Sequence, residues 1–150
     1  MAYESEWLTR KRRIDSRLKA TGWDIVRFSP DMLVNTLDKV AVEELPTANG
    51  PADYGLFVAG RLLGIVEAKK VSVNPQNVLE QAKRYAAGTF HGLGNWDGLR
   101  VPFLYASNGE IVWHLDVRAE KRVSRQIKGS CRTQSPAQGK LSVLVGLASP

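Results

Sequence analysis

The segment "ADYGLFVAGRLLGIVEAKK", residues 52–70, constrains the fold more than any other part of the chain. Two apolar runs flank a turn through Gly60, which predicts a β-hairpin with strands over residues 54–58 and 62–68. Asp53 opens the first strand, and Glu67 and Lys69 stand at the end of the second. Charged groups are costly to bury unless they are paired or bind an ion, so these three charges mark a candidate site.

Strand geometry places the three charges close together. Residues two apart on a strand point to the same face, so Glu67 and Lys69 project together while Ala68 points away. Antiparallel pairing sets Asp53, at the start of one strand, beside Glu67, near the end of the other. Neighbouring carboxylates raise each other's pKa unless a cation lies between them. A Mg²⁺ ion meets that condition, because it takes one or two carboxylates and leaves its other positions to water and phosphate oxygens.

The lysine completes a site that suits phosphodiester hydrolysis. An ammonium group beside bound metal stabilises the negative charge that develops around phosphorus. Asp53, Glu67 and Lys69 are therefore candidate catalytic residues, with Asp53 and Glu67 as metal ligands. Taken alone, the D…E-x-K pattern fits a second interpretation equally well, a salt-bridged strand end at the rim of the sheet.

Composition limits the class of protein. A chain of 150 residues with 43% hydrophobic content suits one domain with its own core. The 21 Lys and Arg against 15 Asp and Glu give a net charge of +6, which favours polyanionic partners such as nucleic acid. Cys131 is the single cysteine, which excludes an internal disulfide and a C-x-x-C site. No apolar run approaches the length of a membrane span, so we expect a cytoplasmic protein without a membrane partner.

The N-terminal segment predicts one helix with a strongly basic surface. Ser5 is a candidate cap, Trp7, Ile14 and Leu18 recur near helical spacing, and Gly22 is a stop signal. The basic side chains either form a solvated face or contact DNA phosphates. The candidates for contact with the DNA backbone are Arg10, Lys11, Arg13 and Arg17.

The remaining patterns complete an α/β arrangement. "KVAVEEL" alternates like a strand, and a helix is predicted from Asn74 and Pro75 to Gly88. Asn108-Gly109 between two apolar runs predicts a second hairpin. The order α-β-β-β-α-β-β indicates a mixed β-sheet flanked by helices. We expect this domain to occupy residues 1–118 and a basic, loosely ordered tail to occupy residues 119–150.

Several segments, taken in order, resemble one family of DNA-cleaving enzymes. "PADY" and "EAK" resemble the motif of PD-(D/E)xK nucleases, although Ala52 separates Pro51 from Asp53. Across roughly residues 4–117, the chain resembles the N-terminus of the restriction (R, or HsdR) subunits of type I restriction enzymes. The segments that carry this resemblance are "ESEWLTRKRRIDSRLKATGW", "PADYGLFVAGRLLGIVEAKK", "QAKRYA" and "ASNGEIVWHLD".

The resemblance implies a fold and a set of site residues. The fold would be a restriction-endonuclease-like core, and residues 1–118 would be the nuclease domain. Asp53 and Glu67 would bind Mg²⁺, and Lys69 would be the catalytic lysine. Gln81 and Tyr85 match the Q-x-x-x-Y motif of the family and would support the active site or the DNA. Glu6 is a further candidate metal ligand, because related nucleases often aim an acid from the first helix at the metal.

The resemblance also implies an activity and partners. The expected function is Mg²⁺-dependent cleavage of double-stranded DNA in restriction-modification, together with modification and specificity subunits. Family members use ATP through a motor domain, and this chain contains no G-x-x-x-x-G-K-[ST] loop, so ATP would act only through a motor missing from it. Two alternatives remain open: a non-catalytic DNA-binding or subunit-docking remnant, and another PD-(D/E)xK nuclease of the repair or resolvase type.

Overall fold

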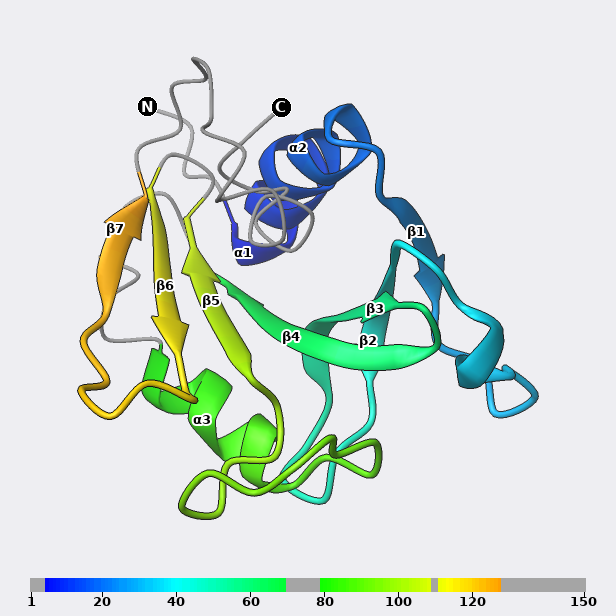
Figure 1. Ribbon diagram of the computed structural model, residues 1–150. Helices are drawn as coiled ribbons and strands as arrows, with labels where there is room; N and C mark the ends of the chain where they lie inside the picture. Colours follow the sequence, from blue (N-terminus) through cyan, green and yellow to red (C-terminus); the bar gives the residue numbers. More distant parts are fainter. Residues whose placement is uncertain (1–4, 70–78, 109–110, 128–150) are drawn as a thin grey trace.

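The computed structural model describes residues 5–69, 79–108 and 111–127, which form a mixed seven-stranded sheet with helices on both faces (Figure 1). This arrangement confirms the predicted α/β class. The helical elements are α1 (Glu6–Thr9), the π-helical turn η1 (Arg10–Ile14), α2 (Asp15–Ala20), the 3₁₀ turn η2 (Val34–Thr36) and α3 (Leu79–Ala87). The strands are β1 (Asp24–Arg27), β2 (Val40–Leu45), β3 (Ala52–Val58), β4 (Arg61–Ala68), β5 (Phe103–Ser107), β6 (Val112–Asp116) and β7 (Arg125–Ile127).

The strands lie in the sheet in the order in which they occur in the chain. β1 with β2 and β4 with β5 are parallel pairs, and the other neighbours are antiparallel. Parallel neighbours need a long crossover connection, and the connection from β4 to β5 contains α3. The crossover places α3 on one face of the sheet, while α1 and α2 lie on the opposite face (Figure 1).

The predicted hairpin of β3 and β4 is confirmed. Tyr54 pairs with Val66 and Val58 with Arg61, with one irregularity between Leu56 and Phe57. The turn consists of Ala59 and Gly60, whose φ angles are 51° and 74°. Two successive residues with positive φ are typical of the tight turns that match the twist of antiparallel strands. This register brings the first residues of β3 opposite the last residues of β4.

The sheet is wider than the sequence patterns indicated, because β1 and β7 were not predicted. β7 pairs with β6 and lies beyond residue 118, so the boundary predicted there is too early for the sheet. Only three residues long and mostly exposed, β7 has no apolar alternation that a sequence pattern would reveal. Residues 128–150 lie outside the described residues, so the tail itself stays a prediction.

The N-terminal helix is present but irregular. Ser5 Oγ accepts a hydrogen bond from the Leu8 N–H at 3.2 Å, as expected of a cap. Ile14 and Leu18 are buried as predicted, whereas Trp7 is 60% exposed and does not belong to the apolar face. The π-helical turn η1 interrupts the α-helix between α1 and α2. Its buried residues are Arg10 and Ile14, so a basic residue lies on the face that was predicted to be apolar.

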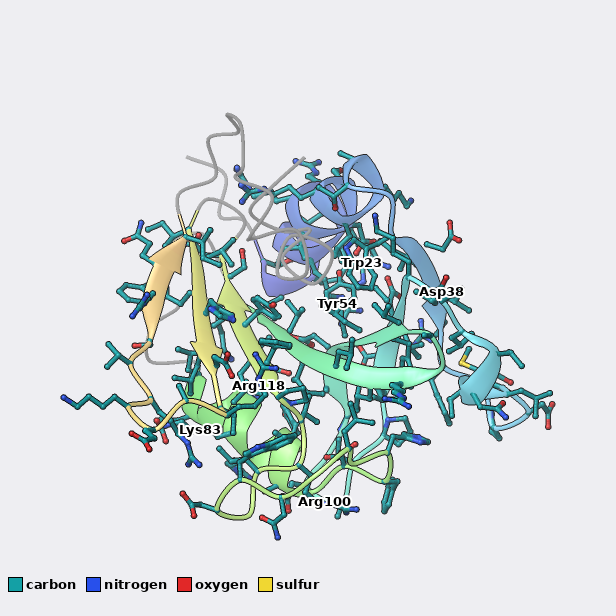
Figure 2. The ribbon with its side chains drawn as sticks, in the orientation of Figure 1. Trp23, Asp38, Tyr54, Lys83, Arg100 and Arg118 are labelled. Carbon is teal, nitrogen blue, oxygen red and sulfur yellow. The ribbon has the colours of Figure 1, made fainter. Side chains whose placement is uncertain are left out.

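Two apolar cores lie on the two faces of the sheet. The first helices contribute Ile14 and Leu18 to a core that also contains Trp23 and Tyr54 (Figure 2). Helix α3 contributes Leu79, Ala82 and Ala86 to the other core. Within the described residues, no helix combines the length and the apolar character that crossing a membrane requires.

The remaining predicted elements are found where the structure describes them. Helix α3 ends at Ala87, just before the predicted stop at Gly88, while the predicted start at Asn74 and Pro75 lies outside the described residues. β5 and β6 form the predicted second hairpin. Residues 109–110 of its turn are likewise outside the description, but the Ile111 N–H donates to Asn108 Oδ1 at 2.8 Å and closes the turn.

Candidate functional site

Asp53 and Glu67 lie side by side, as antiparallel pairing predicts. The Asp53 N–H donates to Glu67 Oε1 at 3.1 Å, and the Ala68 N–H donates to Asp53 Oδ2 at 2.8 Å. Each carboxylate is therefore oriented by a backbone donor of the opposite strand. The two acidic residues close the hairpin at the end remote from the turn at Gly60.

Burial makes this pair of carboxylates electrostatically costly. Burial and, after it, the charge of Asp53 raise the pKa of Glu67 to about 9, while the charge of Lys69 acts in the opposite direction. Burial also raises the pKa of Asp53, against the lowering effects of the Ala68 N–H and the Arg10 charge. Without a cation between them, the two groups favour retaining a proton. A divalent cation in place of that proton would let both be ionised.

Asp53 and Glu67 are the two described carboxylates that could hold a divalent cation at this place. Among residues 5–69, 79–108 and 111–127, no three or more His, Cys, Asp or Glu side chains gather where they would hold a metal ion. Mg²⁺ uses hard oxygen donors and is commonly bound by one or two carboxylates plus substrate phosphate. Asp53 and Glu67 supply that set. Glu6 lies in α1, but its side chain is outside what the structure describes, so its role stays a prediction.

Lys69 directly follows β4 and is held to the neighbouring strand. Its N–H donates to the Ser107 carbonyl oxygen of β5 at 2.9 Å. The side chain is half-buried, and its charge lowers the pKa of Glu67. The structure therefore brings Asp53, Glu67 and Lys69 together at one end of the central strands.

Gln81 and Tyr85 contact each other on α3, because they are one helical turn apart. Gln81 Nε2 donates to the Tyr85 hydroxyl at 2.9 Å. Tyr85 also borders Gly50, where an added Cβ would meet the Tyr85 ring at 3.5 Å. The turn that leads into β3 is joined to the end of α3, since Asn49 Nδ2 donates to the Arg84 carbonyl oxygen at 2.7 Å. The Q-x-x-x-Y pair thus lies against the segment that delivers Asp53.

Two of the basic residues predicted to contact the DNA backbone, Arg10 and Lys11, are paired with acids of the protein. Arg10 is 9% exposed, and its Nη1 lies 2.5 Å from Glu44 Oε1 and 3.3 Å from Asp53 Oδ1. Burial lowers the pKa of the Arg10 guanidinium, but Glu44, together with Tyr54 and Asp53, more than offsets that effect, so the pKa is raised. Acidic residues of the sheet therefore hold the Arg10 side chain, and its contact with DNA stays a prediction.

Lys11 follows the same pattern one residue further on. Its Nζ lies 2.6 Å from Glu43 Oε1 and 3.3 Å from Asp15 Oδ2, and its side chain is 33% exposed, so contact of Lys11 with DNA stays a prediction. Arg13 and Arg17 are half-buried and make further interactions, whereas Arg12 and Lys19 are exposed. Arg12 and Lys19 are therefore the basic residues of this helix that are most open to a partner.

Acids that pair with the first helix were not predicted from the sequence. Glu43 and Glu44 belong to β2, and the buried Asp15 accepts a hydrogen bond from the Tyr54 hydroxyl. A signal was present in the sequence, because two consecutive acids interrupt the otherwise apolar strand "VAVEEL". Buried acids need cationic or hydrogen-bonding partners, and the basic N-terminal helix supplies them.

Comparison with known protein families shows which family the chain resembles. A family described as the type I restriction enzyme EcoKI endonuclease subunit, second domain, matches residues 24–137. The chain belongs to this family. The match includes Asp53, Glu67 and Lys69, and it extends past β7, whereas α1, η1 and α2 precede it. The resemblance inferred from the sequence motifs is thereby confirmed at the level of the type I endonuclease subunit.

A solved structure has the same fold. A fragment from Vibrio vulnificus YJ016, assigned as an HsdR subunit of a type I restriction enzyme, matches 98% of this chain with a TM-score of 0.60 and 18% sequence identity. The match covers 26% of that chain, so this protein spans about a quarter of its length. No curated protein sequence matches the chain.

Proposed function

We propose that the chain is a Mg²⁺-dependent endonuclease domain that hydrolyses phosphodiester bonds of double-stranded DNA in type I restriction. Its membership in the endonuclease subunit family supports a restriction nuclease role. The observation that carries the proposal is the pairing of Asp53 with Glu67 at the end of the β3–β4 hairpin, with the charge of Lys69 acting on Glu67. This arrangement has the composition of a PD-(D/E)xK site.

Each of these residues has a defined task in the proposed reaction. Asp53 and Glu67 would hold Mg²⁺, which supplies positive charge beside the phosphate and lowers the pKa of water when bound. The backbone donors at Asp53 and Ala68 orient both carboxylates before substrate arrives. The Lys69 ammonium group would stabilise negative charge on the phosphate during in-line attack. Gln81 and Tyr85 would support the turn before β3 or contact the DNA.

Further partners follow from the same family. Modification and specificity subunits would select the DNA, and ATP would act through a motor domain, as the resemblance to the family implies. Phosphate contacts alone carry little sequence information, so we propose that this domain itself cuts with little sequence preference.

The test is conversion of supercoiled plasmid to nicked or linear DNA by the purified chain, with Mg²⁺ or Mn²⁺ and with EDTA. Asp53→Asn and Lys69→Ala are the informative variants, and Glu80→Gln on the exposed side of α3 is a control for a lost surface charge. We expect metal-dependent cleavage in the wild type and the control, and none in the two site variants.

Calorimetric titration with Mn²⁺ separates the possible failures. Binding that needs Asp53, without cleavage, would indicate a nuclease that requires its partner subunits. Neither binding nor cleavage by a folded wild type would contradict the proposal and favour a docking or DNA-binding remnant. Faster cleavage of branched than of linear DNA would favour a repair or resolvase activity.

A further inference from the structure

A single nitrogen of Arg10 is shared unequally between two carboxylates of the site. Arg10 Nη1 lies 2.5 Å from Glu44 Oε1 but 3.3 Å from Asp53 Oδ1. The guanidinium is thus bound closely to Glu44 and only loosely to the candidate metal ligand. Arg10 is buried, and its Cζ lies over the Tyr54 ring, 5.8 Å from the ring centre. Water therefore has little access to the guanidinium, and the two acids are its main hydrogen-bond acceptors.

Glu44 is placed to compete with Asp53 for this guanidinium. On β2, Glu43 pairs with Tyr54 and Leu45 pairs with Ala52, so Glu44 lies between them, next to Asp53 of β3. Its φ angle is 55°, a left-handed conformation that is uncommon for residues other than glycine. Such outliers persist where the surrounding structure requires them, often at functional sites. Here the outlier is the residue that holds Arg10.

Arg10 would obstruct the site if it were bound fully to Asp53. An arginine and a divalent cation seek the same carboxylate oxygens, and a guanidinium bound to Asp53 Oδ1 would both occupy an acceptor and repel the cation. We propose that Glu44 is a positioning residue, which retains Arg10 and so leaves Asp53 available to a divalent cation. This inference rests on the proposed metal-dependent function and assigns no metal contact to Glu44 itself.

The neighbouring ion pair provides a matched control. Lys11 Nζ lies 2.6 Å from Glu43 Oε1, so it joins the same helix to the same strand one residue away. Within the described residues, no ion pair or hydrogen bond between Lys11 and Asp53 is observed. Glu43→Gln and Glu44→Gln therefore remove the same charge from adjacent positions, and only the second releases Arg10.

The experiment measures Mn²⁺ affinity by calorimetry for the full chain and five variants. They are Glu44→Gln, Glu43→Gln, Arg10→Gln, the double variant Arg10→Gln with Glu44→Gln, and Asp53→Asn. We expect Glu44→Gln to weaken Mn²⁺ binding about tenfold, the lower end of what an opposite charge does to a carboxylate. The double variant should return to the affinity of Arg10→Gln, because no guanidinium remains to occupy Asp53. Glu43→Gln should stay within about twofold of wild type, since it shares no partner with the ligands.

The outcomes distinguish this role from the proposed function. Wild-type affinity in Glu44→Gln, or a double variant as weak as Glu44→Gln alone, would overturn the role of Glu44. Equal losses of Mn²⁺ affinity in Glu43→Gln and Glu44→Gln would also overturn it, because the change in net charge alone would then explain the effect. A folded wild type that binds no Mn²⁺, or binding unaffected by Asp53→Asn, would instead overturn the metal site itself. Thermal unfolding confirms the fold of each variant, and Glu44→Asp, which keeps the charge but shortens the reach to Arg10, replaces Glu44→Gln if that variant does not fold.

Discussion

At the scale of single residues, the Glu67 carboxyl group meets two opposing requirements. It is 2% exposed and lies beside Asp53, so the folded chain favours its protonated form. Binding of a divalent cation requires the ionised form. A divalent cation must therefore displace the proton that burial and the charge of Asp53 favour, so its binding releases a proton and should tighten as the pH rises.

This conflict predicts a pH dependence of stability. The pKa of Glu67 rises from 4.5 in its ordinary state to about 9 in the fold. Between those values the folded state binds more protons than the unfolded state, so the contribution of Glu67 is present below pH 4.5 and is lost as the pH rises toward 9. In EDTA, Glu67→Gln should therefore gain stability relative to wild type as the pH rises from 5 to 8, because the glutamine carries no proton that must be lost.

Urea denaturation followed by circular dichroism at pH 5 and pH 8 measures this difference. Asp116→Asn is a control, because Asp116 is a carboxylate whose pKa is lowered by its hydrogen bond with Arg118, so its loss should not stabilise the fold at high pH. No gain of Glu67→Gln over wild type between pH 5 and pH 8 without metal would contradict the raised pKa of Glu67.

The site residues that could be predicted from the sequence are those placed by short-range patterns within one hairpin or one helix. Asp53, Glu67 and Lys69 fall at fixed places in one hairpin, and Gln81 with Tyr85 follows helical spacing. Arg10 and Glu44 could not be paired in this way. They are 34 positions apart, and their contact depends on a left-handed backbone at Glu44 and a π-helical turn that buries Arg10. Neither feature has a signature in hydrophobic periodicity.

At the scale of elements, the β3–β4 turn fixes the register that brings Asp53 to Glu67. Gly60 has a φ of 74°, and a Cβ added there would lie 2.3 Å from the carbonyl oxygen of Asn35. Gly98 has a similar φ of 85°, but a Cβ there would meet nothing within 4 Å. The two glycines share the backbone constraint and differ in the space around them.

Alanine substitutions should separate these two effects. Gly98→Ala should cost about 1–2 kcal/mol of unfolding free energy, the penalty of a side chain in left-handed backbone. Gly60→Ala should cost roughly 2–5 kcal/mol, because crowding against fixed backbone adds to that penalty. Urea denaturation of both variants measures the difference. Equal losses would mean that the contact of the turn with Asn35 is unimportant.

Helices and strands with a strong apolar pattern in the sequence were predicted correctly, and those without one were missed. The hairpins, β2 and the apolar face of α3 have long apolar runs or regular spacing, and all were found. β1 and β7 are short edge strands with mainly exposed residues, so hydrogen bonds to β2 and β6 define them rather than alternation. Trp7 was misassigned because the helix changes its winding at η1, which rotates the buried face.

At the scale of the whole molecule, the net charge of +6 does not show how much positive charge the first helix exposes to solvent. Arg10 and Lys11 are neutralised by acids of the sheet, whereas Arg12 and Lys19 are exposed. A cation that stays paired with an acid of the protein releases no counterions from DNA when a complex forms. The salt dependence of binding therefore reports where a charge lies, and not only how many charges the chain carries.

Two substitutions of the same kind on the same helix test this distinction. Lys19→Gln and Lys11→Gln each remove one positive charge, but Lys19 is exposed and Lys11 pairs with Glu43 and Asp15. If DNA lies against the outer surface of the helix, Lys19→Gln should reduce the slope of log K against log salt by about 1, and Lys11→Gln should leave the slope unchanged. Fluorescence anisotropy with a labelled duplex, in EDTA and at several salt concentrations, gives both slopes. Unchanged slopes in both variants would place the DNA on another surface, and equal reductions would mean that the Lys11 ion pair opens when DNA binds.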